Sequence, residues 1–564
     1  MRHPDRLLRP LHPALGPLRR DLDLGQIGRR EFLTRASALG LAVALPRQAR
    51  SQTAEPPGLR IQMRVLPQSD PRLYDFTEKY NAVSGLLDTL VRVERDGRLA
   101  GVLVDRWETS DDGRDIRLHL REGVTWSNGD RFTAGDVLAN LDAWCDSTVA
   151  GNSMAARLGA LIDPGTGRLR TGAALALDPL TVALHLEAPD ITLLPGLTDY
   201  PAAVMHPSRI GASPLDQPIG TGAYRIADYQ PGSHAVLERD PARTPWRAGH
   251  LDRIEFVDLG PDPLAYIAAA RAHQIDVIYD SIGETVAAMD SLGWQRSEID
   301  TSSTIVLRAN QRFAPGTGDS PYADPRVRRA LSLAVDNAVM LELGYAGRGL
   351  VAENHHVAPM HPAYARIDTP RPDPRAARML MHEAGMMDYE HDLVSIDDDW
   401  RRFTADVMAA QLRDAGFKVN RRILPAAEYH AGWKDFGFSA TNWNGRELAV
   451  QVLDLAYRSG ATWNETGFAN ADFDRLLDRA KGLSDVEERR AVMAELERIL
   501  IANAVIVQPY WRRLIRHARP GVLGARRHQK DIIDGHDLAL AGWGTAGPLS
   551  SGRIAHRWAR RPRR

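Results

Sequence analysis

The sequence predicts an α/β fold, because strands and amphipathic helices alternate along it and one stretch has the order strand, helix, strand. Residues 251–259 (LDRIEFVDL) read as a strand, and residues 275–279 form a second, short apolar strand. Between them, residues 263–272 (PLAYIAAARA) have the composition of a helix with proline in its first turn. Two strands joined in this way by a helix are typical of a parallel βαβ unit.

The other predicted elements follow from the spacing of apolar residues and from turn and cap signals. Alternation of apolar and polar side chains indicates strands, and a Thr with an acid three residues later indicates a helix start. Strands are expected at 59–65, 107–120 (a hairpin around Asp-Asp-Gly), 181–186, 305–310, 418–424 and 504–510. Helices are expected from Thr133, and over 324–335, 375–385, 403–416 and 485–502.

Composition places the chain among ordinary globular proteins. It has 564 residues, of which 25% are charged and 44% hydrophobic, and a mean hydropathy of −0.32. These values exclude collagenous, coiled-coil and wholly disordered chains and argue against a polytopic membrane protein. The single cysteine, Cys145, excludes an intramolecular disulfide and is expected to pack as a small apolar side chain.

The net charge of −1 hides an uneven distribution. Residues 1–49 carry nine arginines and four acidic residues, and residues 553–564 carry six arginines and no acid. Between these ends, 56 basic and 68 acidic residues remain of the total 71 and 72, so the body has a charge of about −12. An acidic body argues against nucleic-acid binding, which requires a basic face.

The basic N-terminal segment has the order of an export signal. Arg29 and Arg30, with Phe32 and Leu33 behind them, precede the short apolar run 36–45 (ASALGLAVAL). Ten apolar residues are too few to span a bilayer, which takes about 20. The paired arginines resemble a twin-arginine signal, so we expect residues 1–54, with their long basic start, to direct export by the Tat machinery to the periplasm. No cysteine follows the run, so a lipoprotein anchor is not expected.

Seven short motifs, in one order, carry a resemblance to a known family. They are VDRWETSDDG (104–113), LREGVTWSNG (120–129), FTAGDV (132–137), IGTGAY (219–224), VRRAL (327–331), the segment 377–385 and FANADFD (468–474). This series, over about 59–520, resembles the extracytoplasmic solute-binding proteins of ABC importers, in the oligopeptide, dipeptide and nickel family (family 5).

The resemblance implies a two-lobed periplasmic-binding-protein fold of α/β type, with ligand held between lobes that close about hinge strands. Lobe 1 is expected at 55–306 plus 509–550, with an extra domain inserted at 86–205, and lobe 2 at 307–508. Residues 551–564 are expected as a basic disordered tail. The expected protein is a soluble monomer that serves ABC permease subunits of the inner membrane, needs no cofactor and catalyses no reaction.

The resemblance also points to ligand-binding residues. In peptide binders of the family, a Trp followed three residues later by Asp holds the peptide ammonium; here Trp443 matches, but Arg446 stands at the Asp position. A guanidinium there favours a carboxylate, phosphate or sulfonate on the ligand. Two alternatives remain open: Arg446 faces solvent or Glu447, or the register shifts so that Glu447 or Asp454 takes the Asp position.

Other candidates are polar and aromatic residues near this motif or in the opposite lobe. Flat side chains with a few oriented polar groups suit a small-molecule cleft, although core packing is the alternative for each aromatic residue. The candidates are Asn442, Asn444, Tyr457 and Trp463 near the motif, and Tyr80 and Asn81 in lobe 1.

His355 and His356, with His361 close behind, form an unusual cluster. They are candidates for contact with an organic ligand, for a metal site or for a structural loop, since Pro359 and Pro362 indicate a turn. A nickel or metallophore receptor is therefore the alternative to a receptor for a peptide-like or acidic small molecule. A periplasmic hydrolase is less favoured, because no GxSxG, HExxH or Walker motif is present. A chaperone role is also less favoured.

Overall fold

The structure is a computed structural model that describes residues 58–241, 245–316, 318 and 320–542. It divides into two units, residues 1–55 and 56–564, and every described residue belongs to the second. The expected export signal, with Arg29, Arg30, Phe32 and Leu33, and the expected tail at 551–564 lie outside the described residues.

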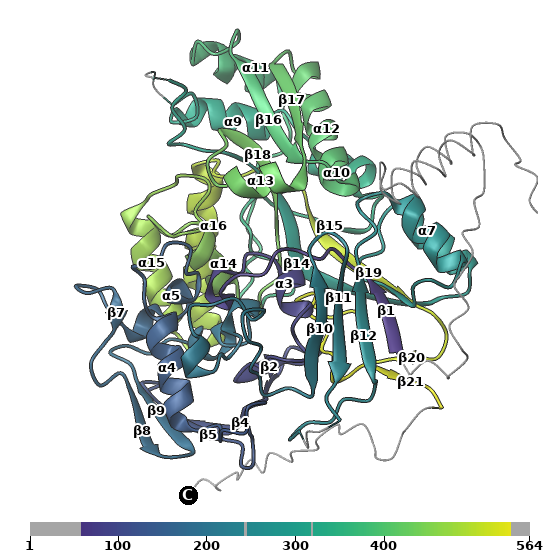
Figure 1. The fold of residues 1–564 in the computed structure, drawn as a ribbon. Coiled ribbons are helices and arrows are strands. Elements are labelled where there is room, and N and C mark those ends of the chain that lie inside the picture. Colours follow the sequence, from purple (N-terminus) through teal and green to yellow (C-terminus); the bar gives the residue numbers. More distant parts are fainter. Residues whose placement is uncertain (1–57, 242–244, 317, 319, 543–564) are drawn as a thin grey trace, which may run out of the picture. The chain divides into compact units, whose positions relative to one another are not determined.

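A mixed sheet of eleven strands forms the centre of the second unit (Figure 1). Ten strands follow one another in space, and β15 (Gly349–Val351) pairs with β19 at the side. Their order is β10 (Tyr224–Gln230), β11 (His234–Arg239), β12 (Arg253–Val257), β1 (Gly58–Gln62), β13 (Val277–Ile278), β19 (Tyr510–Ala518), β14 (Gln295–Ala309), β18 (Phe438–Trp443), β16 (Glu390–Ile396) and β17 (Lys418–Leu424).

The predicted βαβ unit is confirmed. Strands β12 and β13 both run parallel to β1, which lies between them. Helix α7 (Pro263–Arg271) connects them and begins at Asp262, whose carboxylate accepts a hydrogen bond from the N–H of Leu264. A carboxylate at this position satisfies one of the free N–H groups of a helix start.

Strand β14 joins the two halves of the sheet. Its first part, Gln295–Asp300, pairs with β19, and its last part, Thr304–Ala309, pairs with β18. Its side chains are all buried from Thr301 onward, as expected for a strand covered on both faces.

The predicted strand at 504–510 is wrong in its bounds, because β19 begins only at Tyr510. Before it, Val507 makes a single bridge to Leu307. Two features prevent a regular ladder: Ala504 has φ +44°, and Pro509 has no N–H to donate.

Four helices pack with β16, β17 and β18 around one apolar core (Figure 1). They are α9 (Pro325–Leu333), α10 (Asn337–Tyr345), α11 (Pro374–Glu383) and α12 (Asp399–Asp414). Each begins after an aspartate whose side chain accepts a backbone N–H, namely Asp324, Asp336, Asp373 and Asp398. The cap at Asp398 explains why α12 begins four residues before the predicted Phe403.

A smaller sheet lies within residues 86–205. Strands β4 (Val104–Thr109), β5 (Asp115–Leu120), β9 (Thr181–His185) and β8 (Ala174–Asp178) are neighbours in that order. Helix α4 (Ala134–Trp144) packs on it and has the predicted capping box of Thr133 and Asp136. Cys145 is buried in this core, as predicted. The domain and lobe boundaries themselves stay predictions.

Three helices form a further core beside β18: α14 (Ala449–Ala456), α15 (Ala471–Gly482) and α16 (Val486–Ala502). The remaining helices are α3 (Thr77–Asn81), α5 (Met154–Arg157), α6 (Leu193–Gly196), α8 (Glu284–Ser291) and α13 (Ala426–Gly432). The remaining strands are β2 (Val91–Val93), β3 (Leu99–Gly101), β6 (Ile162–Asp163), β7 (Arg168–Leu169), β20 (Val522–Leu523) and β21 (Ala539–Leu540). Among the described residues, none of the helices has the length and apolar character to cross a membrane.

Glu497 on α16 gives the fold a measurable pH dependence. Burial raises the pKa of its carboxyl to about 8, so the folded protein holds a proton there that the unfolded chain releases above about pH 4.5. This raised pKa stabilises the fold below pH 4.5, and the stabilisation is lost as pH rises towards 8. As the pH rises from 4.5 to 8, the free energy of unfolding of the Glu497→Gln variant, measured in urea, should increase relative to that of the parent by about 1.4 kcal/mol per pH unit. Parallel stability curves for the two proteins would contradict this.

Candidate ligand-binding site

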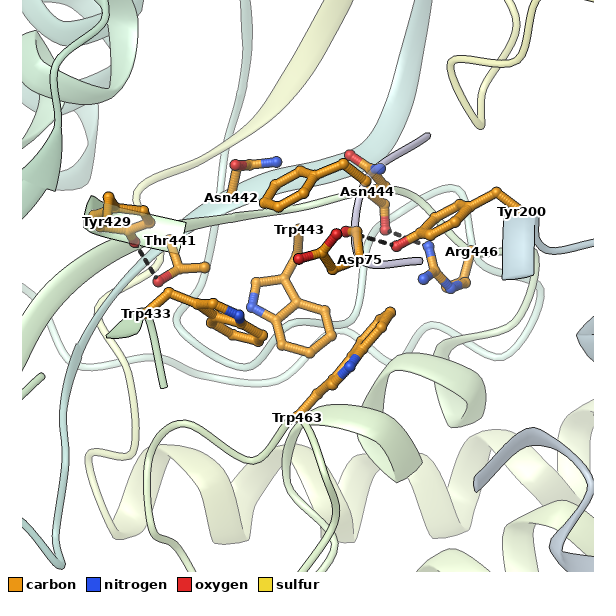
Figure 2. Close-up of a pocket in the computed structure, with 11 residues that line it drawn as sticks. Asp75, Tyr200, Tyr429, Trp433, Thr441, Asn442, Trp443, Asn444, Arg446 and Trp463 are labelled. Carbon is orange, nitrogen blue, oxygen red and sulfur yellow. Dashed lines mark hydrogen bonds between the residues drawn. The ribbon is translucent and has the colours of Figure 1, made fainter. Parts of the chain in front are cut away.

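A cavity of about 510 Å³ opens where β18 ends, and eleven residues line it (Figure 2). They come from distant parts of the chain: Asp75, Phe76, Tyr200, Tyr429, Trp433, Thr441, Asn442, Trp443, Asn444, Arg446 and Trp463. Five predicted site residues are thus brought together: Asn442, Trp443, Asn444, Arg446 and Trp463.

Aromatic rings form most of the cavity wall. The rings of Trp443 and Trp463 meet edge to face, with centroids 5.8 Å apart, and Trp433 lies beside them (Figure 2). Phe76 and Tyr200 add apolar surface from the first half of the chain. Such a wall suits the apolar part of a small ligand and leaves orientation to a few polar groups.

A buried ion pair holds this wall in place. Glu465 accepts a hydrogen bond of 2.9 Å from Trp443 Nε1 through one oxygen, and its other oxygen lies 2.9 Å from Arg308 Nε. Arg308, on β14, is fully buried and also donates to the carbonyls of Phe436 and Trp433. Sequence analysis missed this pair, although an arginine inside the apolar strand at 305–310 was a signal that a buried partner must exist.

Arg446 is buried and paired rather than free. Its Nη2 lies 3.2 Å from Asp199 Oδ2, and its Nη1 donates to the carbonyls of Asn444 and Gly445. The alternative in which Arg446 faces solvent is therefore wrong, while the carboxylate of Glu447 lies 3.0 Å from Lys530 Nζ. A direct contact of Arg446 with a ligand anion stays a prediction.

The charges around Arg446 compensate one another. Burial alone would lower the pKa of Arg446, but Asp199, Tyr200 and Glu447 together raise it above its ordinary value. Burial also acts to raise the pKa of Asp199, but Arg446, Arg157 and Lys530 hold it well below its usual range. Both groups therefore stay ionised over the whole neutral pH range.

Asp75 is a lining residue that sequence analysis missed. Its side chain is 28% exposed, and its Oδ1 lies 2.9 Å from Lys79 Nζ. Its backbone carbonyl accepts a hydrogen bond of 3.1 Å from Tyr200 Oη, which fixes the segment at the cavity (Figure 2). The segment has no periodicity and belongs to no motif, so nothing local in the sequence marked it.

The amides of the two asparagines make hydrogen bonds within the protein. Asn442 lines the cavity, and its Oδ1 accepts a hydrogen bond from Arg401. Asn444 Nδ2 donates to Thr77 Oγ1 at 2.9 Å and so ties the end of β18 to α3.

Three predicted contacts lie behind the wall and do not line this cavity. His356 Nδ1 is 2.7 Å from Tyr457 Oη, and its ring packs edge-on against Trp443 with centroids 5.6 Å apart. His355 is buried, with Nε2 3.2 Å from Glu353. Burial lowers the pKa of His356 well below its ordinary value, so the ring is neutral. His356 supports Trp443, and the described residues contain no group of three or more His, Cys, Asp or Glu that could hold a metal ion.

The lobe 1 candidates also lie elsewhere. Asn81 is fully buried, donates to the Asp531 carbonyl and accepts from the N–H of Ile533, so both ends of its amide are used in packing. Tyr80 lines a different hollow together with Asp88 and Arg247. Neither Tyr80 nor Asn81 lines the Trp443 cavity, and their contact with a ligand stays a prediction.

Comparison with known proteins agrees with this architecture. The family model described as "Bacterial extracellular solute-binding proteins, family 5 Middle" matches residues 98–462. The chain belongs to this family. The probable deoxycholate-binding periplasmic protein YgiS of Escherichia coli (strain K12) is 24% identical over 84% of this chain and 91% of its own length. The dipeptide-binding protein DppE of Bacillus subtilis (strain 168) is 21% identical over 83% of this chain and 90% of its own length.

The solved structures establish the fold class. Haemophilus influenzae OppA, in complex with the peptide RPPGFSPFR, superposes with a TM-score of 0.77 at 19% identity, over 87% of this family 5 chain and all of that chain. The predicted two-lobed α/β fold of periplasmic binding proteins is therefore confirmed. The matched relatives are binding proteins and not enzymes.

The Glu465–Arg308 pair should be essential to the stability of this family 5 protein. Glu465→Ala leaves Arg308 buried without its carboxylate, so we expect a loss of about 3–5 kcal/mol in urea unfolding. Glu428→Ala, an exposed site on α13, is the control and should change stability by less than about 0.5 kcal/mol. The double variant Arg308→Met/Glu465→Leu should recover part of the loss. A Glu465→Ala variant as stable as the control would contradict the role given to the pair.

Proposed function

We propose that this protein is the periplasmic receptor of an ABC importer and that it binds a small zwitterionic, peptide-like molecule in the Trp443 cavity. One observation carries the proposal: a carboxylate, that of Asp75, and a guanidinium, that of Arg446, line the same aromatic cavity. Family membership supports the receptor role.

Asp75 is the group suited to a ligand ammonium. It is the only carboxylate among the described lining residues, and it is partly exposed to the cavity. Charge-assisted hydrogen bonds between an ammonium and a carboxylate are about twice as strong as neutral ones, and more so where water is excluded. In the family motif the residue three positions after the Trp binds the ammonium, but here that residue is Arg446, which cannot. Asp75 binds the ammonium in its place.

Arg446 is the group suited to a ligand carboxylate. Asp199 and two backbone carbonyls use its Nη groups, while its Nε has no hydrogen-bond partner among the described residues. Asp199 already balances the charge of Arg446. Arg446 therefore acts on a ligand mainly as a hydrogen-bond donor rather than as an unbalanced positive charge. A ligand with both charges therefore fits better than a simple anion.

The names of the relatives mention a dipeptide, deoxycholate and the peptide RPPGFSPFR, so their ligands vary in size and chemistry. The aromatic wall of this chain, with two charged groups, favours the dipeptide class.

The proposal includes export and delivery. The twin-arginine pattern at Arg29 and Arg30 supports export by the Tat machinery, and the periplasmic relatives support the destination. There a monomeric, soluble receptor, with no lipid anchor, would close around its ligand and present it to permease subunits, as hinge motion of two lobes allows.

Replacing Asp75 should weaken the binding of ligands that carry an ammonium and leave the binding of ligands without one unchanged. The Asp75→Asn variant should bind the dipeptide Met-Leu about 10- to 100-fold more weakly, because a charge-assisted hydrogen bond contributes about 1.5–3 kcal/mol. N-acetyl-Met-Leu, which lacks the ammonium, should bind both proteins equally weakly. Isothermal titration calorimetry measures all four affinities.

The matched control is Asp111→Asn, an exposed aspartate in the turn of the β4–β5 hairpin. It changes the net charge by the same amount and should leave Met-Leu binding unchanged. Equal loss of affinity for the free and the acetylated dipeptide would show that Asp75 does not meet the ammonium. If no dipeptide, free or acetylated, bound the unmodified protein, the ligand class itself would be wrong.

A further inference from the structure

A second hollow, of about 1,040 Å³, is strongly basic and shares no lining residue with the Trp443 cavity. It lies between the first residues of β14, the last of β19, strand β20 and the turn between β2 and β3. Four arginines line it, Arg95, Arg296, Arg516 and Arg526, against one acid, Glu298. Glu298 lies 2.6 Å from Arg296 Nη2, so this pair is neutral and three guanidiniums remain.

Arg95 and Arg526 have no carboxylate partner among the described residues. Arg95 Nε is buried without a hydrogen bond. Arg526 lines the same hollow, and burial, together with the positive charge of Arg526, lowers the pKa of Arg95. Two like charges held together in this way favour an anion between them.

Arg516 forms the floor and is the decisive residue. It is only 1% exposed; its Nε donates to the Tyr279 carbonyl at 3.1 Å, and its Nη2 has no hydrogen-bond partner among the described residues. Burial lowers the pKa of Arg516 to about 9, and the neighbouring Arg527 contributes to the shift. Removing a partner from a buried charge is strongly destabilising, so an unpaired buried guanidinium calls for a counter-ion.

The acids beneath Arg516 are already used. Asp280 lies 2.8 Å from Arg512 Nη2 and 3.1 Å from Arg527 Nη2, and Asp531 lies 2.6 Å from Arg527 Nη2. Three buried arginines thus share two aspartates, and the excess charge falls on Arg516, next to the hollow.

We propose that this hollow is a binding site for a phosphate-type oxyanion, held by Arg95, Arg516 and Arg526. Guanidinium groups match the oxygens of phosphate in bidentate pairs, and several on one tetrahedral group give strong, directed binding. The phosphate group has two possible sources, a free phosphate or phosphate ester of the periplasm, and a phospholipid headgroup of the membrane. The chemistry is the same for both, and it is independent of the ligand in the Trp443 cavity.

Titration of the full chain with inorganic phosphate, at constant ionic strength, tests the proposal. We expect saturable binding of one phosphate per chain, weakened at least tenfold in the Arg95→Gln/Arg526→Gln variant. Arg117→Gln, an exposed arginine on β5, is the control and should bind as the parent does. All variants should keep the affinity of the parent for the ligand of the Trp443 cavity, which separates this test from that of the proposed function.

Arg516→Met gives a second, independent readout. In phosphate-free buffer this variant should melt at a higher temperature than the parent, because an unpaired buried charge is removed. Added phosphate should raise the melting temperature of the parent and leave that of the variant unchanged. A lower melting temperature of Arg516→Met without phosphate would overturn the claim that Arg516 is a destabilising charge without a carboxylate partner.

Vesicles distinguish the two sources of phosphate. Co-sedimentation with phosphatidylglycerol vesicles but not with phosphatidylcholine vesicles, lost in Arg95→Gln/Arg526→Gln, would assign the site to a lipid headgroup. Saturable binding of inorganic phosphate without vesicle binding would assign it to a free phosphate. If neither probe bound, or if the double variant bound both as well as the parent, the proposal would be wrong.

Discussion

The ion pair of Arg308 and Glu465 is the interaction on which the candidate site depends. Arg308 lies on β14, the strand that pairs with both β19 and β18, so its position is set by the sheet. Glu465 follows Trp463 and accepts the indole N–H of Trp443. One buried pair therefore connects the central sheet to two walls of the cavity. Neither charge is exposed by more than 2%, so the pair is rigid, and its desolvation is offset only because every partner is in place.

Buried charges around the candidate site are compensated by neighbouring charges of opposite sign. Asp199 is shared by Arg446 and Arg157. Where the compensation is complete, the charges serve structure. Arg446 Nε and Arg516 Nη2 have no hydrogen-bond partner among the described residues, and both arginines line a hollow. A molecule bound there could accept their hydrogen bonds. The same physical argument thus supports a zwitterion in one hollow and an oxyanion in the other.

The sequence could predict the elements because their signals are local. Alternation identified β17 at its observed bounds, and the capping residue Thr133 marked the start of α4. The strand expected at 504–510 failed, because pairing there depends on the backbone of Ala504 and Pro509 more than on side-chain alternation.

The candidate site could be predicted only where it is continuous in sequence. The stretch from Asn442 to Arg446 was found, because β18 presents it to the cavity as one segment. Asp75 lies in an aperiodic loop and Tyr200 begins a 3-10 helix of three residues, and no local pattern in the sequence indicates that either lies near β18. The partner of Arg446 was missed for the same reason, since Asp199 lies far away in sequence. His355 and His356 were predicted as site residues only because they are clustered in the sequence, but both are buried in the packing behind the cavity wall.

The most direct test of the account is to identify what the protein holds when it is purified from the periplasm. Native mass spectrometry, followed by denaturing release and fragmentation, gives the mass and the ionisable groups of the bound molecule. The account predicts one small molecule per chain with both a free ammonium and a carboxylate, within the size range of a dipeptide. A bound molecule that lacks an ammonium, such as a simple carboxylic acid, would contradict the pairing of Asp75 and Arg446 as the two ends of the site.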